Sequence, residues 1–391
     1  MKKVLLISTR PPYPLYNGSA IRTFQAIEFF HKMSYTVDVL YLTTQKDNLQ
    51  TDLGLKKYCR NVYSFYFRDI SSYWNVFRSL FYNMLPLQVN YYYFKKVRKW
   101  IKEHVSEYDL FFCNNIRSAE YIRDMNVYKI IDFVDAISMN YEKAVSKRKG
   151  LWHYIYKIDH KRCLKYERCL LNSFDKYMII SETDRDYILS SSSVVISVIE
   201  NYVRISDKLI IHQAGNHNIV FVGTMNYEPN ISAVTYFVNE VMPLLLIKYP
   251  DVRFHIVGNK PSLEVLDLIS EHIFVTGFVT DVWNYLKQSA VVAIPMLSGA
   301  GIQNKILEAM SVGACVVTTP IGFEGLKNSE GAPFVARSTE EMVVLISEWF
   351  ESVEQRTVIG MRAKQYVQDN YSEENIFAKF KSFIGDNNSN L

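Results

Sequence analysis

The sequence predicts two doubly wound α/β domains, each a parallel sheet with helices on both faces. Short continuous apolar runs alternate with segments of helical periodicity, which is the pattern of buried parallel strands joined by helices. The 391 residues exceed one ordinary hydrophobic core and suit two. A polar segment without sustained periodicity, residues 202–217, separates two such series and is predicted to be the linker.

The first domain is predicted to span residues 1–201. Its apolar N-terminal run stops at Ser8, short of the apolar region of a signal peptide, and is therefore expected to be a first strand. No run approaches the ~18 apolar residues of a membrane span. Long helices are expected at 20–33 and 141–174. The predicted strands are 4–8, 35–42, 62–66, 110–113, 129–133, 176–181 and 194–199.

The second domain is predicted to span residues 218–370, and residues 371–391 are predicted to form a C-terminal helix that can pack back on the first domain. Ligands of open α/β sheets bind beyond the carboxyl ends of the strands, so the default site is a cleft between two facing domains. Strands are expected at 218–223, 252–257, 273–276, 290–295 and 314–318. Helices are expected at 231–248, 262–270, 282–288, 303–312, 340–349 and 351–369.

The charge is divided unevenly along the chain. Residues 1–200 carry 30 Lys+Arg and 20 Asp+Glu, whereas the remainder carries 14 and 20. A basic half favours an anionic partner, or is only a set of solvated helix faces. Residues 94–102, FKKVRKWIK, fit peripheral contact with an anionic membrane, or a helix that packs through Phe94, Val97 and Ile101. No nucleic-acid recognition module is visible, so nucleic acid is not an expected partner.

The five cysteines are scattered, without the spacing of a zinc site or a redox pair. This pattern predicts reduced thiols in a cytoplasmic protein. The histidines also lack carboxylates that would complete a metal set, so no metal is expected.

The segment PMLSGAGIQNKILEAM, residues 295–310, is the strongest candidate for a binding site. A predicted strand ends at Pro295, a loop of small residues follows, and then a helix begins. Gly299 and Gly301 allow the backbone to approach a ligand closely. The free N–H groups at the start of the helix suit a diphosphate.

Two side chains on this helix complete the pattern. Lys305 adds a positive charge one turn into the helix, and Glu308 lies on the same face. A carboxylate there can accept hydrogen bonds from the two hydroxyls of a ribose. The alternative is an ordinary surface ion pair between Lys305 and Glu308, which is common at this spacing.

The strings GAGIQNKILEAM at 299–310 and GACVVTT at 313–319 resemble the C-terminal domain of GT-B glycosyltransferases. The likeness is greatest to the retaining group called family 4, in the branch of bacterial exopolysaccharide sugar transferases. It spans nearly the whole chain and is strongest in residues 216–326. Further matching strings are PPYP at 11–14 with Gly18 and Ser19, IDFVD at 131–135, YER at 166–168, IENYV at 199–203, FVGTMNYEPN at 221–230 and VTGFVTDV at 275–282.

This resemblance implies a GT-B fold, two Rossmann-like domains that face each other across a cleft. It implies a hexosyltransferase-like enzyme that moves a sugar from a UDP- or GDP-sugar to a glycan or lipid-linked glycan, with retention, in bacterial surface polysaccharide synthesis. The implied enzyme needs no cofactor beyond the nucleotide-sugar co-substrate. The implied location is the cytoplasm or the inner face of the plasma membrane.

The resemblance also implies residue roles. Glu308 would bind the ribose, Lys305 and the neighbouring backbone would hold the diphosphate, and Val279 would contact the base through its main chain. Asp135 follows a strand and is a candidate catalytic residue near the acceptor, or else caps the next helix, and Asp132 is expected to be structural. The expected donor-binding residues are Gly18, Ser19, Gly223, Thr224, Met225, Asn226, Val279, Gly301, Ile302, Gln303, Lys305 and Glu308.

The sequence departs from the family pattern at two places. Ala300 stands where many members carry a glutamate that contacts the donor sugar. Met225 and Asn226 stand near the position of an arginine in a usual Arg/Lys pair, so Lys305 and Arg22 are expected to supply the missing charge. These departures keep two alternatives open: a non-catalytic nucleotide-sugar-binding subunit, and a nucleotide-sugar epimerase or hydrolase on the same fold.

Overall fold

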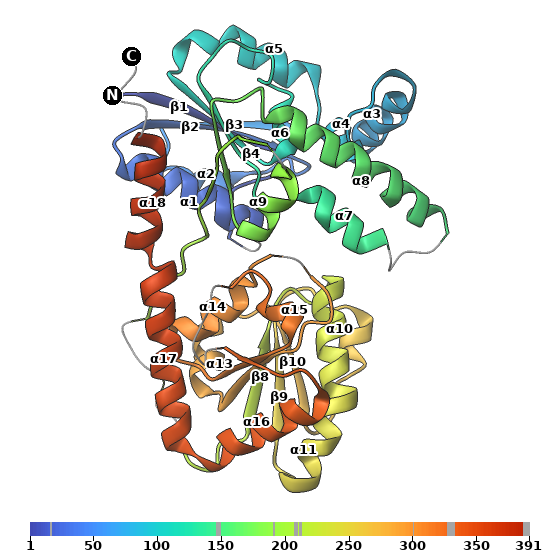
Figure 1. The fold of residues 1–391 in the computed structure, drawn as a ribbon, viewed down its shortest axis with the longest axis vertical. Coiled ribbons are helices and arrows are strands. Elements are labelled where there is room, and N and C mark those ends of the chain that lie inside the picture. The colour runs from blue at the N-terminus through green and yellow to red at the C-terminus, as the bar shows by residue number, and fades with distance from the viewer. Residues whose placement is uncertain are drawn as a thin grey trace. The chain divides into compact units, whose positions relative to one another are not determined.

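A computed structural model describes residues 1–15, 18–145, 150–190, 192–206, 210, 213–299, 301–326 and 333–385. The chain forms two compact units. The first is Met1–Asn201 together with Phe377–Leu391, and the second is Tyr202–Ile376. Figure 1 shows that each unit is built around one sheet with helices packed against it.

The sheet of the first unit has seven parallel strands in the order β3-β2-β1-β4-β5-β6-β7. Its middle strand β1 is the predicted first strand, and residues 4–7 of it are fully buried. All seven strands occur near their predicted positions. Their bounds are β1 Lys3–Ser8, β2 Thr36–Thr43, β3 Asn61–Tyr66, β4 Leu110–Asn114, β5 Lys129–Asp132, β6 Lys176–Ile179 and β7 Ile196–Val198.

Helices cover both faces of this sheet. On one face, Phe112 of β4 contacts Phe30 of α1 and Phe380 of α18, with ring centroids 5.4 and 6.5 Å apart. On the other face, Phe111 packs in one cluster with Val97 of α5. The helices are α1 Gly18–Lys32, α2 Leu49–Leu55, α3 Asp69–Tyr82, α4 Leu87–Tyr91, α5 Lys95–Glu103, a 3-10 turn Val105–Glu107, α6 Ile116–Ala119, α7 Ile137–Val145, α8 Leu151–Leu170, α9 Glu182–Leu189 and α18 Glu373–Gly385.

One predicted helix of the first unit differs from the structure, and one segment with two open interpretations fits the second of them. The helix predicted at 141–174 is two helices, α7 and α8. Gly150, directly before α8, has a φ of 63°, which an α-helical residue cannot have. In α5, Val97 and Ile101 are fully buried. The apolar residues of the basic segment 94–102 therefore pack into the core, as the second interpretation of that segment expected.

The sheet of the second unit has six parallel strands in the order β10-β9-β8-β11-β12-β13. The sequence predicted the first five but not β13, whose two residues are too few to form a pattern. The bounds are β8 Asn218–Val222, β9 Arg253–Val257, β10 Ile273–Gly277, β11 Val291–Ile294, β12 Val316–Thr318 and β13 Phe334–Val335.

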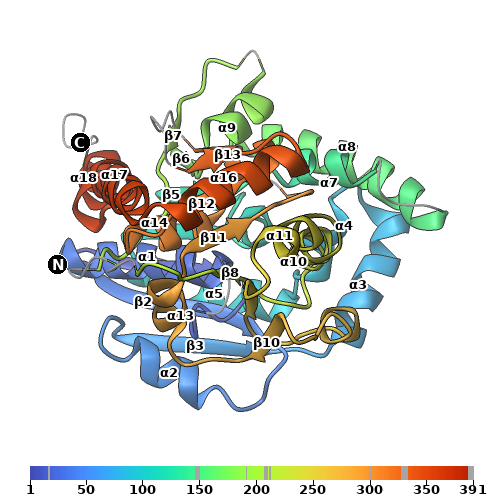
Figure 2. The same cartoon turned by 90° about the horizontal axis from the view of Figure 1, so that it is seen from below.

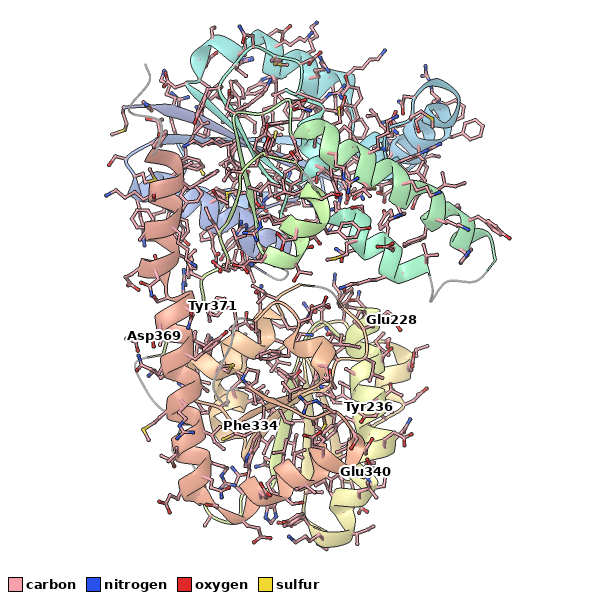
Figure 3. All side chains as sticks on the ribbon, in the orientation of Figure 1. Glu228, Tyr236, Phe334, Glu340, Asp369 and Tyr371 are labelled. Atoms are coloured by element: carbon pink, nitrogen blue, oxygen red, sulfur yellow. The ribbon has the colours of Figure 1, made fainter. Side chains whose placement is uncertain are left out.

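Figure 2 shows α10 and α11 on one side of this second sheet and α13 and α14 on the other. A hydrogen bond joins α10 to α16, because the Tyr236 hydroxyl lies 2.8 Å from Oγ1 of Thr339, the first residue of α16. Figure 3 labels Tyr236 and Glu340, which follows Thr339. The helices are α10 Glu228–Tyr236, a π-helical turn Phe237–Val241, α11 Met242–Lys248, α12 Leu263–Leu266, α13 Val282–Gln288, α14 Asn304–Ser311, α15 Pro320–Phe323, α16 Thr339–Glu351 and α17 Val353–Tyr371.

The continuous helical stretch Glu228–Lys248 contains no long apolar run, yet it is the one candidate membrane span among the described residues. It is long and apolar enough to cross a membrane by length and composition, since an 18-residue window of it has a mean hydropathy of 1.4. Phe237 and Val241 in it are fully buried in the core of the second unit, and 39% of that window is buried within the structure. Pro243, the second residue of α11, lacks an N–H and crowds the preceding turn, and the π-helical turn Phe237–Val241 ends directly before α11.

The predicted linker lies along the second unit. The N–H of Val203 donates to the carbonyl of Tyr371 at 2.9 Å. Nη2 of Arg356 donates to the carbonyl of Gln213 at 2.7 Å. Residues 207–209 and 211–212 of this segment lie outside the described residues.

Candidate functional site

The strand order of the second sheet reverses next to its middle strand β8. The chain runs from β8 outward through β9 to β10, and then returns to the other side of β8 as β11. Ligands of open α/β sheets bind in the crevice beyond the carboxyl ends of the strands at such a reversal. The loops that follow β8 and β11, residues 223–227 and 295–303, carry most of the predicted donor contacts.

The loop after β11 leads into α14 through two unusual backbone positions. Gly299 and Gly301 have φ values of 142° and 68°, which favour glycine over any other residue. The side chain of Gln303 does not cap the helix that follows. The N–H of Ile306 donates to the carbonyl of Gln303 at 2.9 Å. The N–H groups of Asn304 and Lys305 come before the first helical acceptor, and a diphosphate can supply one. Ala300 lies outside the described residues.

Lys305 projects from the first turn of α14 into a mostly buried setting. Its Nζ donates to Oδ1 of Asn230, lies 3.6 Å from Sδ of Met296, and lies 5.2 Å from the ring centroid of Phe221. Burial lowers the pKa of Lys305 to about 8, although the nearby Glu308 carboxylate opposes this shift. An anionic ligand would restore the full charge of this lysine.

Glu308 lies one turn after Lys305 and is half-buried. Burial raises its pKa to about 7, and Lys305 acts in the opposite direction. Within the described part of the chain the two side chains form no ion pair, because Lys305 bonds Asn230 instead. The surface ion pair considered from the sequence is therefore wrong. A carboxylate so poorly solvated gains from hydroxyl donors such as those of a ribose.

Asn230 is a site residue to which sequence reasoning assigned no role. It is buried in the first turns of α10, and its Nδ2 donates to the carbonyl of Thr224 at 3.0 Å while its Oδ1 accepts from Lys305. It thus ties the loop after β8 to α14. A Cβ added to Gly223 would lie 2.6 Å from Nδ2 of Asn230, so Gly223 makes room for this bridge. The Pro-Asn string at the helix start was visible, but its long-range bonds were not.

Two buried acceptors at this crevice have no hydrogen-bond partner among the described residues. They are Oδ1 of Asn259, which follows β9, and Oδ1 of Asn304, which begins α14. Buried polar atoms are nearly always satisfied by protein, water or ligand. Their place at the carboxyl edge suits donors from a nucleotide.

The remaining predicted donor contacts of the second unit are placed as follows. Met225 has a fully buried side chain, its N–H donates to the carbonyl of Asn259 at 2.9 Å, and its carbonyl accepts from the N–H of Ser262. It therefore shapes the loop. Asn226 is exposed, and Val279 follows β10 and packs partly against the core. Gly301 and Ile302 lie in the loop before α14, and their ligand contacts, like those above, remain predictions.

In the first unit, Gly18 and Ser19 begin α1, beyond the end of β1. The carbonyl of Ser19 accepts a hydrogen bond from Oγ1 of Thr23 at 2.8 Å. The preceding residues 16 and 17 lie outside the described residues. The expected contacts of Gly18 and Ser19 with a donor also remain predictions.

Arg22 does not fill the role expected for it. Its Nε and Nη2 donate to the carboxylate of Asp132 at 2.6 and 3.2 Å, and its Nη1 donates to the carbonyl of Ile199 at 2.7 Å and to Oδ1 of Asn201 at 3.2 Å. The side chains of Arg22 and Asp132 are 4% and 0% exposed. The prediction that Arg22 supplies charge to a diphosphate is wrong, whereas the structural role predicted for Asp132 is confirmed.

Asp135 follows β5 in a polar cluster of the first unit. Burial, with a smaller contribution from the nearby Asp184 carboxylate, raises the pKa of Asp135 to about 6, and the Arg117 guanidinium opposes this. Nδ2 of Asn140 donates to its Oδ2 at 2.7 Å. Its protonation state thus changes near neutral pH, as a proton-transfer group requires. Its catalytic role remains a prediction.

Other carboxylates accept from the N–H groups at the start of α7. The N–H of Ala136 donates to Asp184 at 2.8 Å, and the N–H of Ser138 donates to Glu167 at 3.2 Å. Burial raises the pKa of Glu167 to about 8. The capping role considered for Asp135 is thus filled by Asp184 and Glu167.

Comparison with known proteins shows what the chain is similar to. Residues 216–351 match the family model described as Glycosyl transferases group 1. An uncharacterized 44.6 kDa protein in the cps region of Klebsiella pneumoniae is 24% identical, and the match covers 97% of this chain and 98% of that protein.

Solved structures match the whole chain. TarM of S. aureus matches with a TM-score of 0.71 at 13% identity, over 98% of this chain and 99% of TarM. Anabaena HepE, solved in complex with UDP, matches with a TM-score of 0.66 at 14% identity, over 99% of this chain and 100% of HepE. The two sheets with their strand orders and these matches establish the fold. The chain has the GT-B fold, and its residues 216–351 match the family model of the glycosyl transferases group 1.

Proposed function

We propose that this protein transfers a sugar from a nucleotide-diphosphate donor to a glycan acceptor, with retention, in the synthesis of a bacterial surface polysaccharide. The observation that carries the proposal is the group Lys305, Asn230 and Glu308 at the strand reversal of the second sheet. It combines a half-buried cation, the N–H groups of Asn304 and Lys305 at the helix start and a poorly solvated carboxylate within one helical turn. These are the groups that a diphosphate and a ribose require.

The proposed chemistry depends on stabilising a leaving group. As the bond between the sugar and the diphosphate breaks, negative charge builds on the diphosphate oxygens. Lys305 and the N–H groups at the start of α14 are fixed near those oxygens before the reaction begins, so little reorganisation is needed. Glu308 anchors the ribose and so fixes the diphosphate against the helix. Asp135 is proposed to act on the acceptor from the first unit.

The similar proteins support the chemical class that we propose for the donor and for the acceptor. HepE was solved with UDP and with UDP-glucose. A TarM variant was solved with UDP, α-GlcNAc-glycerol and Fondaparinux, the last two of which are glycans or glycosides. The Klebsiella relative lies in a cps region. We therefore propose a UDP- or GDP-sugar donor, a glycan acceptor and a place at the cytoplasmic side of the membrane.

The test is titration of purified protein with UDP-, GDP- and dTDP-sugars, followed by calorimetry and by nucleotide release. At least one donor should bind, and Glu308→Ala should weaken its binding by about tenfold or more, because hydrogen bonds to a charged group contribute about 1.5–3 kcal/mol. Glu348→Ala is the matched control, an exposed glutamate in the last turn of α16 and thus at the opposite edge of the sheet. It should leave binding unchanged.

The outcomes separate the alternatives. Binding of no donor would refute the proposal. Binding without nucleotide release, whatever glycan is offered, would favour a non-catalytic nucleotide-sugar-binding subunit. Release to water alone, or interconversion of the sugar, would favour a hydrolase or an epimerase.

A further inference from the structure

Strand β5 of the first unit is followed by a strained turn. Val134, two residues after β5, has a φ of 67°. It is the one β-branched residue with a positive φ in the described part of the chain, and such a side chain makes this conformation an outlier. The carbonyl of Phe133 accepts a hydrogen bond from the N–H of Asp135 at 2.9 Å. Residues 133–135 therefore form a γ-turn with a positive φ at its centre, which is a rare and strained conformation.

Hydrogen bonds on both sides of Val134 hold it in this conformation. Its N–H donates to Oδ1 of Asp132 at 2.9 Å, and its carbonyl accepts from the N–H of Ile180 at 3.0 Å. The Asp132 carboxylate also accepts from Nε and Nη2 of Arg22, and both of these side chains are buried. The Arg22–Asp132 pair thus clamps the γ-turn. Without this clamp a valine is expected to return to a negative φ, because its branched side chain disfavours a positive one.

The neighbouring strand β4 is followed by a second strained residue. Asn115, directly after β4, has a φ of 72° and a ψ of 153°, a region that is essentially confined to glycine. Its N–H donates to the carbonyl of Asp132 at 2.7 Å, and its Oδ1 accepts from the N–H of Arg117 at 3.2 Å. Two adjacent strands therefore leave the sheet through conformations that their side chains disfavour. Such strain persists only where the surrounding structure enforces it, and it clusters at functional sites.

The γ-turn sets the direction of the Asp135 carboxylate among groups from four helices. Oδ2 of Asp135 accepts from Nδ2 of Asn140 in α7 at 2.7 Å. Burial, and then the carboxylate of Asp184 in α9, raise the pKa of Asp135 to about 6, while Arg117 of α6 opposes them. Asp135 in turn contributes to the raised pKa of Glu167 in α8. A change in the direction of the γ-turn would therefore change both the hydrogen bond and the pKa of Asp135.

We propose that Val134, Asp132 and Arg22 are positioning residues for sugar transfer. The Arg22–Asp132 pair holds the γ-turn at a positive φ, and the γ-turn holds the Asp135 carboxylate in the orientation in which it acts on the acceptor. A stiff β-branched residue at the centre of the turn leaves Asp135 fewer orientations than a glycine would. The proposal rests on the proposed function in one respect, namely that Asp135 acts on the acceptor.

The first arm of the test measures the strain by thermal unfolding of the full chain. At a negative φ, glycine is less stable than alanine, but at a positive φ the order is reversed, because alanine keeps a Cβ. Val134→Gly should therefore unfold about 2–4 °C above Val134→Ala. The matched control is Val198, a half-buried valine without a positive φ at the end of β7, where the alanine variant should be the more stable. The same order at both positions would overturn the proposal.

The second arm follows the orientation of Asp135 by ¹³C NMR titration of protein labelled at the aspartate carboxyl groups. The resonance that disappears in Asp135→Asn identifies Asp135, which should titrate with a pKa of about 6. Asp132→Asn keeps the shape of its side chain but weakens the clamp, and should lower this pKa by about one pH unit as Asp135 turns toward solvent. Adding Val134→Gly should reverse at least half of this change, because glycine adopts a positive φ without the clamp. Adding Val134→Ala should not.

The third arm measures kcat for nucleotide release from the UDP-, GDP- or dTDP-sugar that the wild type consumes, well below the unfolding temperature of each variant. Asp132→Asn should lower kcat about tenfold or more, since a misplaced catalytic group is that costly, and should leave donor affinity unchanged. Asp132→Asn/Val134→Gly should recover about threefold or more of the loss, and Asp132→Asn/Val134→Ala should recover none. A residue that only stabilises the fold would show no such difference between glycine and alanine.

The outcomes keep this proposal distinct from the proposed function. A wild-type titration and kcat in Asp132→Asn, or equal recovery with glycine and alanine, would overturn the positioning role while leaving sugar transfer intact. Full transfer by Asp135→Asn would do the same. A wild type that releases no nucleotide would instead refute the proposed function, and the titration would still decide whether the clamp orients Asp135.

Discussion

Donor binding is expected to be strongest at about pH 7.5, because two half-buried groups at the site titrate on either side of it. Glu308, with a pKa of about 7, gains its charge as the pH rises. Lys305, with a pKa of about 8, loses its charge as the pH rises further. Binding that needs the carboxylate and the ammonium together follows the product of the two charged fractions.

The size of the effect follows from these two values. At about pH 7.5 each group is charged in about three-quarters of the molecules, and the product falls about sixfold at about pH 6 and again at about pH 9. The assay is calorimetric titration with a nucleotide-diphosphate sugar at a series of pH values. Unlike a free nucleoside diphosphate, such a donor carries no terminal phosphate group that titrates in this range.

Two variants separate the limbs of this profile. Glu308→Gln keeps the shape of the side chain and should remove the acidic limb, while Lys305→Gln should remove the alkaline limb and weaken binding at about pH 7.5 by about tenfold or more. A flat wild-type profile would refute the reasoning. So would an acidic limb that persists in Glu308→Gln, since another group would then be responsible.

Three further outcomes follow from buried contacts. Arg22→Met should lower the free energy of unfolding by about 3–5 kcal/mol in urea titration, because it leaves a buried carboxylate without its partner; a loss below about 1 kcal/mol would contradict the structural role. Asn230→Ala should weaken donor binding, because the bridge between Thr224 and Lys305 disappears, and it should cost less stability than Arg22→Met. If calorimetry shows unchanged donor affinity, Asn230 is not part of the site. Gly360→Ala should destabilise by about 1–3 kcal/mol, since the added Cβ would lie 2.2 Å from a backbone carbonyl oxygen, whereas Gly385→Ala, with nothing within 4 Å, is the control; equal thermal midpoints would contradict the packing.

The sheets were predictable because buried parallel strands give continuous apolar runs. Residues 4–7 of β1 are apolar and fully buried, so burial on both faces is visible in the sequence itself. Strand β13 shows where this signal ends. Its two residues pair with Val317 and Thr318 of β12, but two residues cannot form a periodic pattern.

The site was predictable only where its residues share one element. Lys305 and Glu308 lie on one helix, so their spacing alone indicates that they face the same ligand. Asn230 is 75 positions from Lys305, and Arg22 is 110 positions from Asp132. One sequence shows which residue types are present but not which distant ones meet. For that reason Asn230 was missed, and Arg22 was given a charge-donating role although its guanidinium is already engaged.

Helix α18 has a consequence for the order in which the protein can fold during synthesis. Phe380 on this helix packs against Phe30 and Phe112 of the first unit, yet the part of the helix from Phe377 onward follows the whole second unit in the chain. Domains usually complete their folding in the order in which the ribosome delivers them. Here the first unit to be synthesised is the last to be finished. Until α18 has been synthesised, the aromatic face of the first unit stays open, and we expect a nascent-chain chaperone to cover this surface.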